Sequence, residues 1–554
     1  MFVLSTGLPG SYKKLGEIFF ILRKHSSRSS PQLPISVMAT SLADSSILPT
    51  TSLPAAPEYM GEGLRMDTNE ALGRFVVATR AFAIGELVMQ DQPLVVYTSG
   101  DEASFLRAFS KATPAAQAAI LDMCHPDLDQ SGNALVSYNR GRADELCRAH
   151  GMEAERIHKL LMIREMNGHQ YTGHETVYGD KKSVKAALFS RGSKVAHSCR
   201  PNLAYTSKTR HGGLEYRACR PIAPGEMITF SYDDELWTKN TLERRAHLLE
   251  TKNFICNCPR CLGLDDTSAV CCPRDACVGF ARPDIAPGSL KSTSERWVCS
   301  ACGPLDAKAV AVLCQHERSM LMRLLPLKAA AYESGNDVAA PSAVRAVAEG
   351  ASKLLSPAHW IVSISYELLS TFCVHHATAA KRAKVRGMPD TAPYGSESEL
   401  HSDAAEAAAR HVRICECIAA QCCGGGECER EHSAVHECAK AVFVLAHELR
   451  QLKPRQRSAP VVALVERYLP HIEIMYGKGD VADVLQMLAE TSSKPKPAST
   501  DARSEAEMAA DWLGGLNLVG GPARVAPQAV ATPRSNCNEG RGSGAKKKGN
   551  KGKR

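Results

Sequence analysis

A single cysteine followed, far along the chain, by a closely spaced cysteine trio is the feature that most constrains the fold of this sequence. Cys199 lies in the run VAHSCRPN, and Cys256, Cys258 and Cys261 follow in FICNCPRC. Together they supply four thiolates, the number that a closed tetrahedral zinc site requires. A zinc ion held by all four would tie the segment after Tyr232 back onto the His-Ser-Cys loop and enclose a pocket between the two stretches.

A second group of cysteines follows directly. Cys272 and Cys277 form one pair, Cys299 and Cys302 form another about twenty residues later, and a glycine follows each pair. Two knuckles at this separation are typical of a small zinc ribbon. We prefer Cys272 to the adjacent Cys271 as the ligand because a Cys-Pro step opens knuckles of this kind. The sequence therefore predicts a second zinc site.

A chain of 554 residues whose 21 cysteines include such closely spaced pairs is unlike a short secreted disulfide scaffold. We therefore expect reduced, metal-bound thiols and a location in the cytoplasm, the nucleus or both. Two further groups are interpreted as helix-packing residues, with a metal site as the alternative for each. They are Cys124, His125, Cys147 and His150, and later Cys415, Cys417, Cys422, Cys423, Cys428, His432, His436 and Cys438.

Apolar spacing and turn signals predict alternating structural types along the chain. Strands are expected at 75–78 and 87–89, with a turn between them. Residues 101–165 have helical spacing, residues 184–232 return to short strands, and helical spacing dominates 306–490.

The pattern Asn-Thr-Leu-Glu that begins at Asn240 is a capping box, which predicts the start of a helix. Its apolar spacing places Leu242, Ala246 and Leu249 on one face.

The two ends of the chain differ in composition from the middle. Residues 1–57 are rich in Ser, Pro and Thr and poor in acidic residues, which fits a disordered leader, an organelle transit peptide or a start at Met38. Residues 491–554 are predicted to be disordered. They end in a lysine run that fits a solvated tail or a nuclear import signal. Because no apolar stretch reaches the ~18 residues that a membrane span needs, we expect no membrane partner.

Three sequence blocks together resemble one family. They are GRFVVATRAFAIGELV from Gly73, VAHSCRPN around Cys199, and the run CRPIAPGEMITFSYDDELWTKNTLERRAHLLETKNFICNCPRC that ends at Cys261. They resemble the SET domain of protein lysine methyltransferases, in the SMYD and SmydA-like branch. Relatives there carry a MYND zinc finger, but the Cys and His residues at 124–150 are too few for its two zinc sites.

The resemblance implies an α+β protein built from several parts. A SET-domain β-fold with a helical insert at about 101–165 and a post-SET zinc site would occupy 58–265. A zinc-ribbon-like module at 266–305 and a C-terminal α-helical, TPR-like domain at 306–490 would follow.

The resemblance also implies a cofactor, S-adenosyl-L-methionine (SAM), and residues that contact it. Tyr232 matches the family's catalytic tyrosine, and a buried strand tyrosine is the alternative. His169 and Phe189 match positions on the substrate channel, the alternatives being a surface-loop histidine and a core phenylalanine. The residues that match cofactor contacts are Gly73, Arg74, Phe75, Asn167, Ser193, Ala196, His197 and Phe254.

The implied function is SAM-dependent methylation of a target lysine in a protein substrate, histone or not. Phe75 and Ala196 stand where the family has glycine and asparagine, and they motivate the alternative of a zinc-stabilised interaction scaffold without turnover. Nucleic acid is not an expected partner because the predicted ribbon lacks a dense basic and aromatic face. We expect a monomer.

Overall fold

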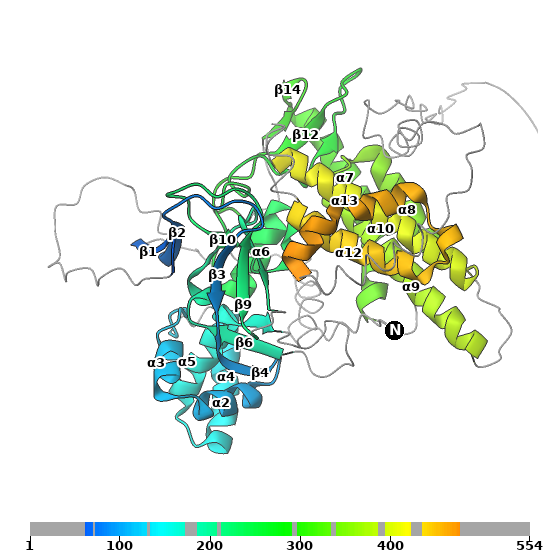
Figure 1. The fold of residues 1–554 in the computed structure, drawn as a ribbon. Helices are drawn as coiled ribbons and strands as arrows, with labels where there is room; N and C mark the ends of the chain where they lie inside the picture. Colours follow the sequence, from blue (N-terminus) through cyan, green and yellow to red (C-terminus); the bar gives the residue numbers. More distant parts are fainter. Residues whose placement is uncertain are drawn as a thin grey trace, which may run out of the picture.

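The computed structural model describes the middle of the chain in detail. The described residues are 61–69, 72–129, 133–171, 185–207, 212–290, 296–333, 340–385, 394–422 and 435–476. The expected leader at 1–57 and tail at 491–554 lie outside them, as do residues 477–490 of the expected helical domain. Figure 1 shows a β-rich part between a lobe of short helices and a bundle of longer helices.

Small sheets form the β-rich part, as the predicted short strands imply. β1 pairs with β2, β3-β9-β8 and β4-β6-β5 are antiparallel sheets, and β7 pairs in parallel with β10. Val76 and Phe189 are fully buried in one core of these sheets, while side chains of β4 and β6 such as Val95 and Leu188 belong to a second core, with the helices described next. The strands are β1 (Leu64–Asn69), β2 (Gly73–Ala78), β3 (Leu87–Asp91), β4 (Pro93–Thr98), β5 (His169–Tyr171), β6 (Lys185–Phe189), β7 (Ala196–His197), β8 (Leu203–Thr206), β9 (Leu214–Ala218) and β10 (Thr229–Phe230).

Helices form the predicted insert between β4 and β5. Side-chain caps begin three of them: Asp101 accepts from the Ser104 N–H, Thr113 from Ala116, and Asn133 from Leu135 and Val136. Their buried faces form a separate core. The helices are α2 (Glu102–Lys111), α3 (Pro114–Leu121), α4 (Ala134–His150) and α5 (Ala154–Asn167).

After β10 the chain forms a short 3₁₀ turn, η3 (Asp234–Trp237), and then α6 (Thr241–Lys252). The predicted cap is confirmed, because the Asn240 side chain accepts from the Glu243 N–H at 2.8 Å.

The apolar face of α6 is not its buried face. Ala246 is exposed, whereas Arg244, Arg245 and Leu248 are fully buried. The arginines can be buried because backbone carbonyls accept their N–H groups. Arg244 donates to Lys239 O, and Arg245 donates to Cys256 O and Cys261 O.

A small antiparallel sheet follows, in the order β11-β12-β13-β14. Its strands are β11 (Val270–Cys271), β12 (Phe280–Pro283), β13 (Trp297–Cys299) and β14 (Gly303–Pro304). Buried side chains of this sheet, including Val270 and Trp297, belong to the same core as the helices that follow. The module is therefore packed on the helical part of the chain.

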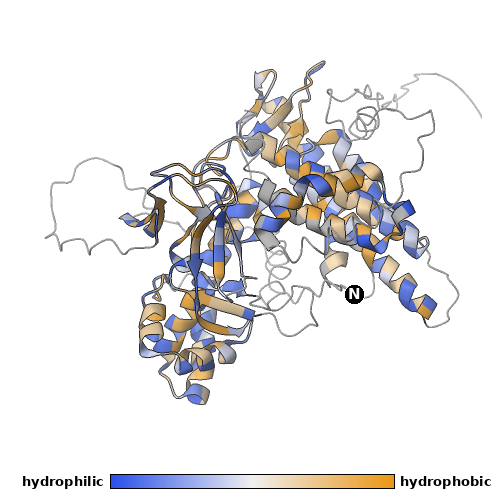
Figure 2. Cartoon of the chain, viewed as in Figure 1, coloured by the Kyte–Doolittle hydropathy of each residue, from blue (hydrophilic) through white to orange (hydrophobic). Residues whose placement is uncertain are grey.

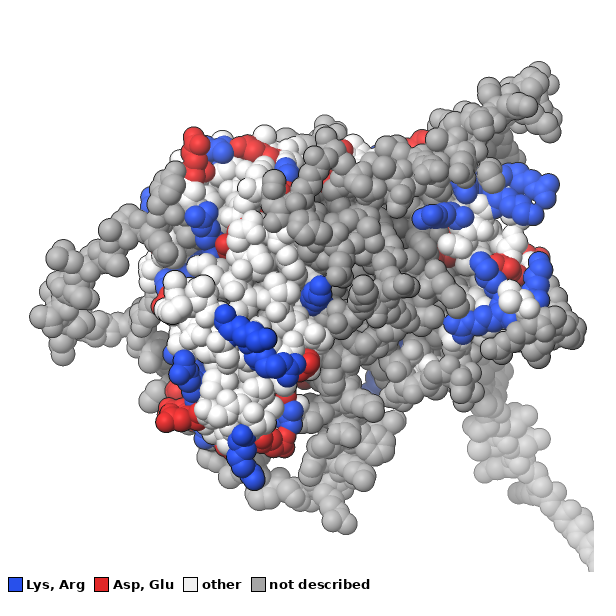
Figure 3. Space-filling view, turned by 60° about the horizontal axis from the view of Figure 1, so that its bottom comes forward, with Lys and Arg blue, Asp and Glu red and all other residues white. Residues whose placement is uncertain are grey.

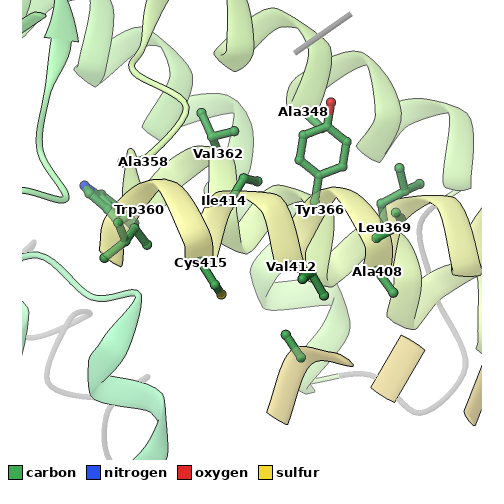
Figure 4. Close-up of a cluster of buried hydrophobic side chains, with 14 of the residues drawn as sticks. Ala348, Ala358, Trp360, Val362, Tyr366, Leu369, Ala408, Val412, Ile414 and Cys415 are labelled. Atoms are coloured by element: carbon green, nitrogen blue, oxygen red, sulfur yellow. The ribbon is translucent and has the colours of Figure 1, made fainter. Parts of the chain in front are cut away.

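The C-terminal described part is helical, as the apolar spacing predicts. Consecutive helices pack against one another, and Figure 4 shows Val362, Tyr366 and Leu369 of α9 beside Val412 of α10. Figure 2 shows polar and apolar residues mixed along each helix, as expected for helices that bury one face. The helices are α7 (Ala307–Glu333), α8 (Pro341–Leu354), α9 (Trp360–Val385), α10 (Glu397–Cys422), α12 (Val435–Gln451) and α13 (Ala459–Tyr476).

The expected α+β composition is thus confirmed. Within the described ranges, every helix is too short or too polar to cross a lipid bilayer. On the face drawn in Figure 3, basic and acidic side chains are interspersed over the described surface.

Candidate functional site

The predicted cysteine quartet meets in space. Sγ of Cys199 lies 3.9 Å from Sγ of Cys256 and 3.6 Å from Sγ of Cys261. Together with Cys258, the four sulfurs all lie within 4.8 Å of one another. A zinc ion with bonds of about 2.3 Å to four thiolates requires sulfurs about 3.8 Å apart. The spacing and the all-thiolate donor set therefore fit a structural zinc ion.

The second quartet also meets. Sγ of Cys272 lies 3.6 Å from that of Cys302, and Sγ of Cys277 lies 3.6 Å from that of Cys299. These four sulfurs again lie within 4.8 Å of one another. Cys271 is not among them, in agreement with the preference for Cys272. The ribbon-like module thus has a donor set that fits a second zinc ion.

Elsewhere in the described residues, no third such group forms. His125 bonds to the Pro126 carbonyl and the Cys147 thiol donates to the Asp144 carbonyl, while Cys415 and Cys438 are buried in the helical core. Cys423, Cys428 and His432, and the side chains of Cys422 and His436, lie outside the described residues.

Buried arginines surround the first quartet. No sequence pattern predicted their burial. Arg245 donates to the carbonyls of Cys256 and Cys261, and Arg260 donates to the carbonyl of Cys199 at 3.2 Å. Zinc bound by four thiolates carries a net negative charge, which these cations would balance. Arg245 also donates to Ala286 O at 2.8 Å and Ser289 O at 3.0 Å, which joins the loop of the first quartet to the ribbon-like module.

Tyr232 lies beside the first quartet and is connected to it through His197. The Tyr232 hydroxyl donates to the Val195 carbonyl at 2.9 Å, and its backbone N–H donates to Nδ1 of His197 at 3.1 Å. Since Nδ1 accepts, Nε2 carries the proton and faces Sγ of Cys199 at 3.2 Å. Burial raises the pKa of Tyr232, so its phenol stays protonated.

His169 is buried among aromatic rings next to Tyr232. Its ring stacks on Phe230 with centroids 5.5 Å apart and meets Phe189 edge-on at 5.5 Å. Nδ1 donates to the Asn167 carbonyl at 2.9 Å and Nε2 accepts from the Tyr216 hydroxyl at 2.9 Å. Burial lowers the pKa of His169 to about 4, so the ring is neutral.

The surface-loop alternative for His169 is therefore wrong. His169 and Phe189 were predicted from the sequence, whereas Tyr205, Tyr216 and Phe230, which complete this aromatic cluster, were not. The one indication in the sequence was that these three aromatic residues lie in the region predicted to form short strands. Strand pairing across 203–230 was needed to bring them together.

The predicted cofactor contacts lie on several elements that meet here. Asn167 ends α5, and its Nδ2 donates to Cys124 O and Ile163 O, both at 2.8 Å. Both N–H groups are thus used, and the oxygen remains to accept from a ligand. The Phe254 ring lies 6.2 Å from Tyr232 and 5.9 Å from His197.

The other predicted contacts come from β2, β7 and the 3₁₀ turn η2 (Gly192–Lys194), which packs against β2. Gly73 has φ +67 and no heavy atom within 4 Å of the position of an added Cβ, which leaves open space there. Arg74 pairs with Asp122 of the insert, and the Ser193 hydroxyl donates to Ser190 O. Phe75 and Ala196 are strand residues that pair with Asp67 and Thr229.

Comparison with known proteins agrees with this geometry. The SET domain family matches residues 73–233. SET domain-containing protein SmydA-8, isoform B, of Drosophila melanogaster is 30% identical over 144 residues, which are 25% of this chain and 30% of that protein. A SET and MYND domain-containing protein of Dictyostelium discoideum is 36% identical over 75 residues, 14% of this chain and 21% of that protein.

Histone-lysine N-methyltransferase set5 of Schizosaccharomyces pombe is 36% identical over 78 residues, which are 14% of this chain and 24% of that protein. The chain spans less than a third of the length of these three relatives. The match nevertheless begins at the strand that carries Gly73 and ends just after Tyr232, so it covers most of the β-core and Cys199 but not the cysteine trio at 256–261. Residues 73–233 form a SET domain, and the protein has relatives among SmydA-8 and the SET and MYND domain-containing proteins.

Proposed function

We propose that this protein transfers a methyl group from SAM to a lysine side chain of a protein substrate. The observation that carries the proposal is the place of the Tyr232 hydroxyl. The hydroxyl donates to the Val195 carbonyl, next to the aromatic cluster of His169. The backbone N–H of Tyr232 is linked to the first cysteine quartet through His197. The name of the set5 relative supports the same reaction class.

The residues present fit SAM by their chemistry. The cofactor, when bound, would supply an electrophilic methyl group on a sulfonium cation. The Asn167 amide oxygen and the neutral rings of Tyr232 and Phe254 suit a cationic ligand, since they offer a lone pair and π-faces rather than further positive charge. The residues Gly73, Arg74, Phe75, Ser193, Ala196 and His197 would contact the rest of the cofactor.

The chain's own residues would prepare the lysine for reaction. A lysine amine has a pKa near 10.4, so it must lose its proton before it attacks. The aromatic rings around His169 and Phe189 are apolar surroundings that would lower the pKa of an amine placed beside them. The phenol of Tyr232 uses its proton on Val195 O, so its lone pairs can accept a C–H···O contact from the methyl group.

Zinc in both cysteine quartets would be structural, with all four positions of each ion filled by protein thiolates. The first ion would hold Phe254 and the loop around Cys256 against the site. We also propose that the helices after residue 306 form a TPR-like domain. We propose that the protein is located in the cytoplasm, the nucleus or both.

A methyl-transfer assay tests the function directly. Zinc-loaded full-length protein is incubated with tritium-labelled SAM and a cell extract, and labelled proteins are identified by mass spectrometry. Label on a lysine, strongly reduced with Tyr232→Phe, supports the proposal. Binding of SAM without label transfer to any lysine contradicts it.

The second candidate function is an interaction scaffold without turnover, favoured by Phe75 and Ala196 at positions where relatives have glycine and asparagine. Calorimetric titration separates the two candidates. Folded, zinc-loaded protein that produces no binding heat with SAM supports the scaffold.

A further inference from the structure

Lys252 is a cation at the candidate site that sequence reasoning missed. It ends α6, and its Nζ donates to the carbonyls of Glu165 at 2.7 Å and Met166 at 3.4 Å. These carbonyls lie in the last turn of α5, directly before Asn167. Nζ also lies 5.9 Å from the centre of the Tyr232 ring. Lys252 is therefore between a predicted cofactor contact and the predicted catalytic residue.

Among the residues that the structure describes, this ammonium forms no ion pair with a carboxylate. The nearby carboxylates of Glu165 and Asp233 pair with Arg164 and His247 instead. Among the described residues, no carboxylate oxygen lies within 4.0 Å of Nζ.

The surroundings of Lys252 have two consequences. Burial lowers the pKa of Lys252, although the carboxylates of Glu165 and Asp233 act in the opposite direction. An ammonium has three N–H donors, and two of those on Lys252 are used by carbonyls. The third is left for an anionic ligand.

The other basic side chains on the predicted cofactor segments are already neutralised. Nη1 of Arg74 lies 2.6 Å from the Asp122 carboxylate, and Nζ of Lys194 lies 3.7 Å from the same carboxylate. Asp122 thus serves both cations. Among the described residues at this end of the site, Lys252 is a cation without a carboxylate within 4.0 Å.

We infer that the Lys252 ammonium binds the α-carboxylate of SAM, beside the Asn167 amide oxygen, which accepts from the α-ammonium. The inference rests on the proposed function. The methionine end of SAM carries one carboxylate and one ammonium, and this pair of side chains offers one cation and one neutral acceptor. Because Glu165 O and Met166 O already hold Nζ in place, little side-chain freedom is lost when the carboxylate binds.

A purely structural role for Lys252 makes a different prediction. A cation at the end of a helix stabilises the last carbonyls whether or not a ligand is present. Loss of such a cap would lower the affinity for every ligand of the site equally. Loss of the partner of a ligand carboxylate would lower the affinity only for ligands that have that carboxylate.

The test is calorimetric binding of SAM and of decarboxylated SAM, which keeps the sulfonium and the ammonium. Lys252→Met should lower the affinity for SAM by about 10- to 100-fold, the range for a lost charged hydrogen bond. The affinity of this variant for decarboxylated SAM should change by less than about 3-fold. Lys252→Arg keeps the cation and should keep a preference for SAM. Lys111→Met, at an exposed lysine of α2, is the control and should behave as wild type.

Each other outcome overturns the inference. Equal loss of both ligands in Lys252→Met would assign Lys252 to capping of α5 alone. A wild-type protein that binds both ligands equally well would also exclude a carboxylate partner. A zinc-loaded wild type that binds neither ligand would instead refute SAM dependence, and the inference with it. Melting curves of the variants without ligand identify any that fail to fold, in which case the preference of Lys252→Arg decides.

Discussion

Nε2 of His197 lies 3.2 Å from Sγ of Cys199, while Nδ1 of the same ring accepts the backbone N–H of Tyr232. One imidazole thus connects a predicted zinc ligand to the strand end that carries the predicted catalytic residue. The His-Ser-Cys sequence therefore has a physical reason in this protein. The zinc loop and the position of Tyr232 are expected to depend on each other.

Removal of zinc should consequently loosen more than the cysteine loop. We expect chelation to raise hydrogen–deuterium exchange at 254–262 and also at 230–237, because His197 loses its anchored thiolate partner. Helix α2, whose Phe105, Leu106 and Phe109 belong to the separate core of the insert, serves as the internal control. Unchanged exchange at 230–237 after zinc loss would show that Tyr232 is positioned independently.

Tyr232→Phe should reduce methyl transfer by about 30-fold. The variant loses the hydroxyl that bonds Val195 O and the C–H···O contact, together worth about 2 kcal/mol. The dissociation constant for SAM should change by less than about 3-fold, since the ring remains. Tyr138→Phe removes a hydroxyl from an exposed tyrosine and is the control. A kcat equal to wild type in Tyr232→Phe excludes the catalytic role.

Gly279→Ala should disrupt the second cysteine quartet. An added Cβ would lie 2.6 Å from Sγ of Cys299 and 2.9 Å from the backbone nitrogen of Ala301, so the thiolate must move. Overpacking of this kind costs about 1–3 kcal/mol. We expect weaker zinc retention at this site during competition with a chelator.

Gly263→Ala is the matched control for this substitution. Its added Cβ would meet only the Pro259 carbonyl oxygen, at 4.0 Å. Equal zinc retention in the two variants would mean that Cys299 is not held in a metal site.

His169 should contribute a pH-dependent part of the stability. Burial lowers its pKa to about 4, whereas the unfolded chain has the ordinary value near 6.5. The unfolded state therefore binds the extra proton first, and stability is lost as the pH falls from about 6.5 to about 4. The full effect is about 3 kcal/mol.

The surroundings of His169 agree with this sign. Nε2 accepts from Tyr216, and the positive charge of Lys252 opposes protonation. The side chain in His169→Asn does not titrate. In urea titrations, the difference in free energy of unfolding, wild type minus variant, should therefore decrease as the pH is lowered from about 6.5 to about 4. A constant difference would mean that His169 is not buried as a neutral ring.

The sequence predicted what depends on local spacing. The second cysteine quartet, the cap at Asn240 and the helices of the insert follow from residues close together in the chain. The first quartet joins Cys199 to a distant trio, and the four thiolates that a tetrahedral zinc ion needs predicted that pairing.

What the sequence did not predict depends on which carbonyls a polar side chain finds after folding. The apolar residues Leu242, Ala246 and Leu249 share one face of α6, and apolar residues are normally the ones buried. Arg245 is buried instead, since it finds carbonyls on two distant loops, at Cys261 and Ala286. The position of Lys252 was not predicted for the same reason, because its Nζ donates to the carbonyls of Glu165 and Met166, which are distant in the sequence.

Elemental analysis of the purified full-length protein tests the central claim most directly. Two zinc ions per chain are expected in the wild type, and one in Cys199→Ser, because that cysteine completes only the first quartet. Cys299→Ser should likewise retain one. A wild type without zinc, or a Cys199→Ser variant that keeps both ions with wild-type affinity, would contradict the claim that Cys199 and the Cys256–Cys261 segment are joined by one metal ion.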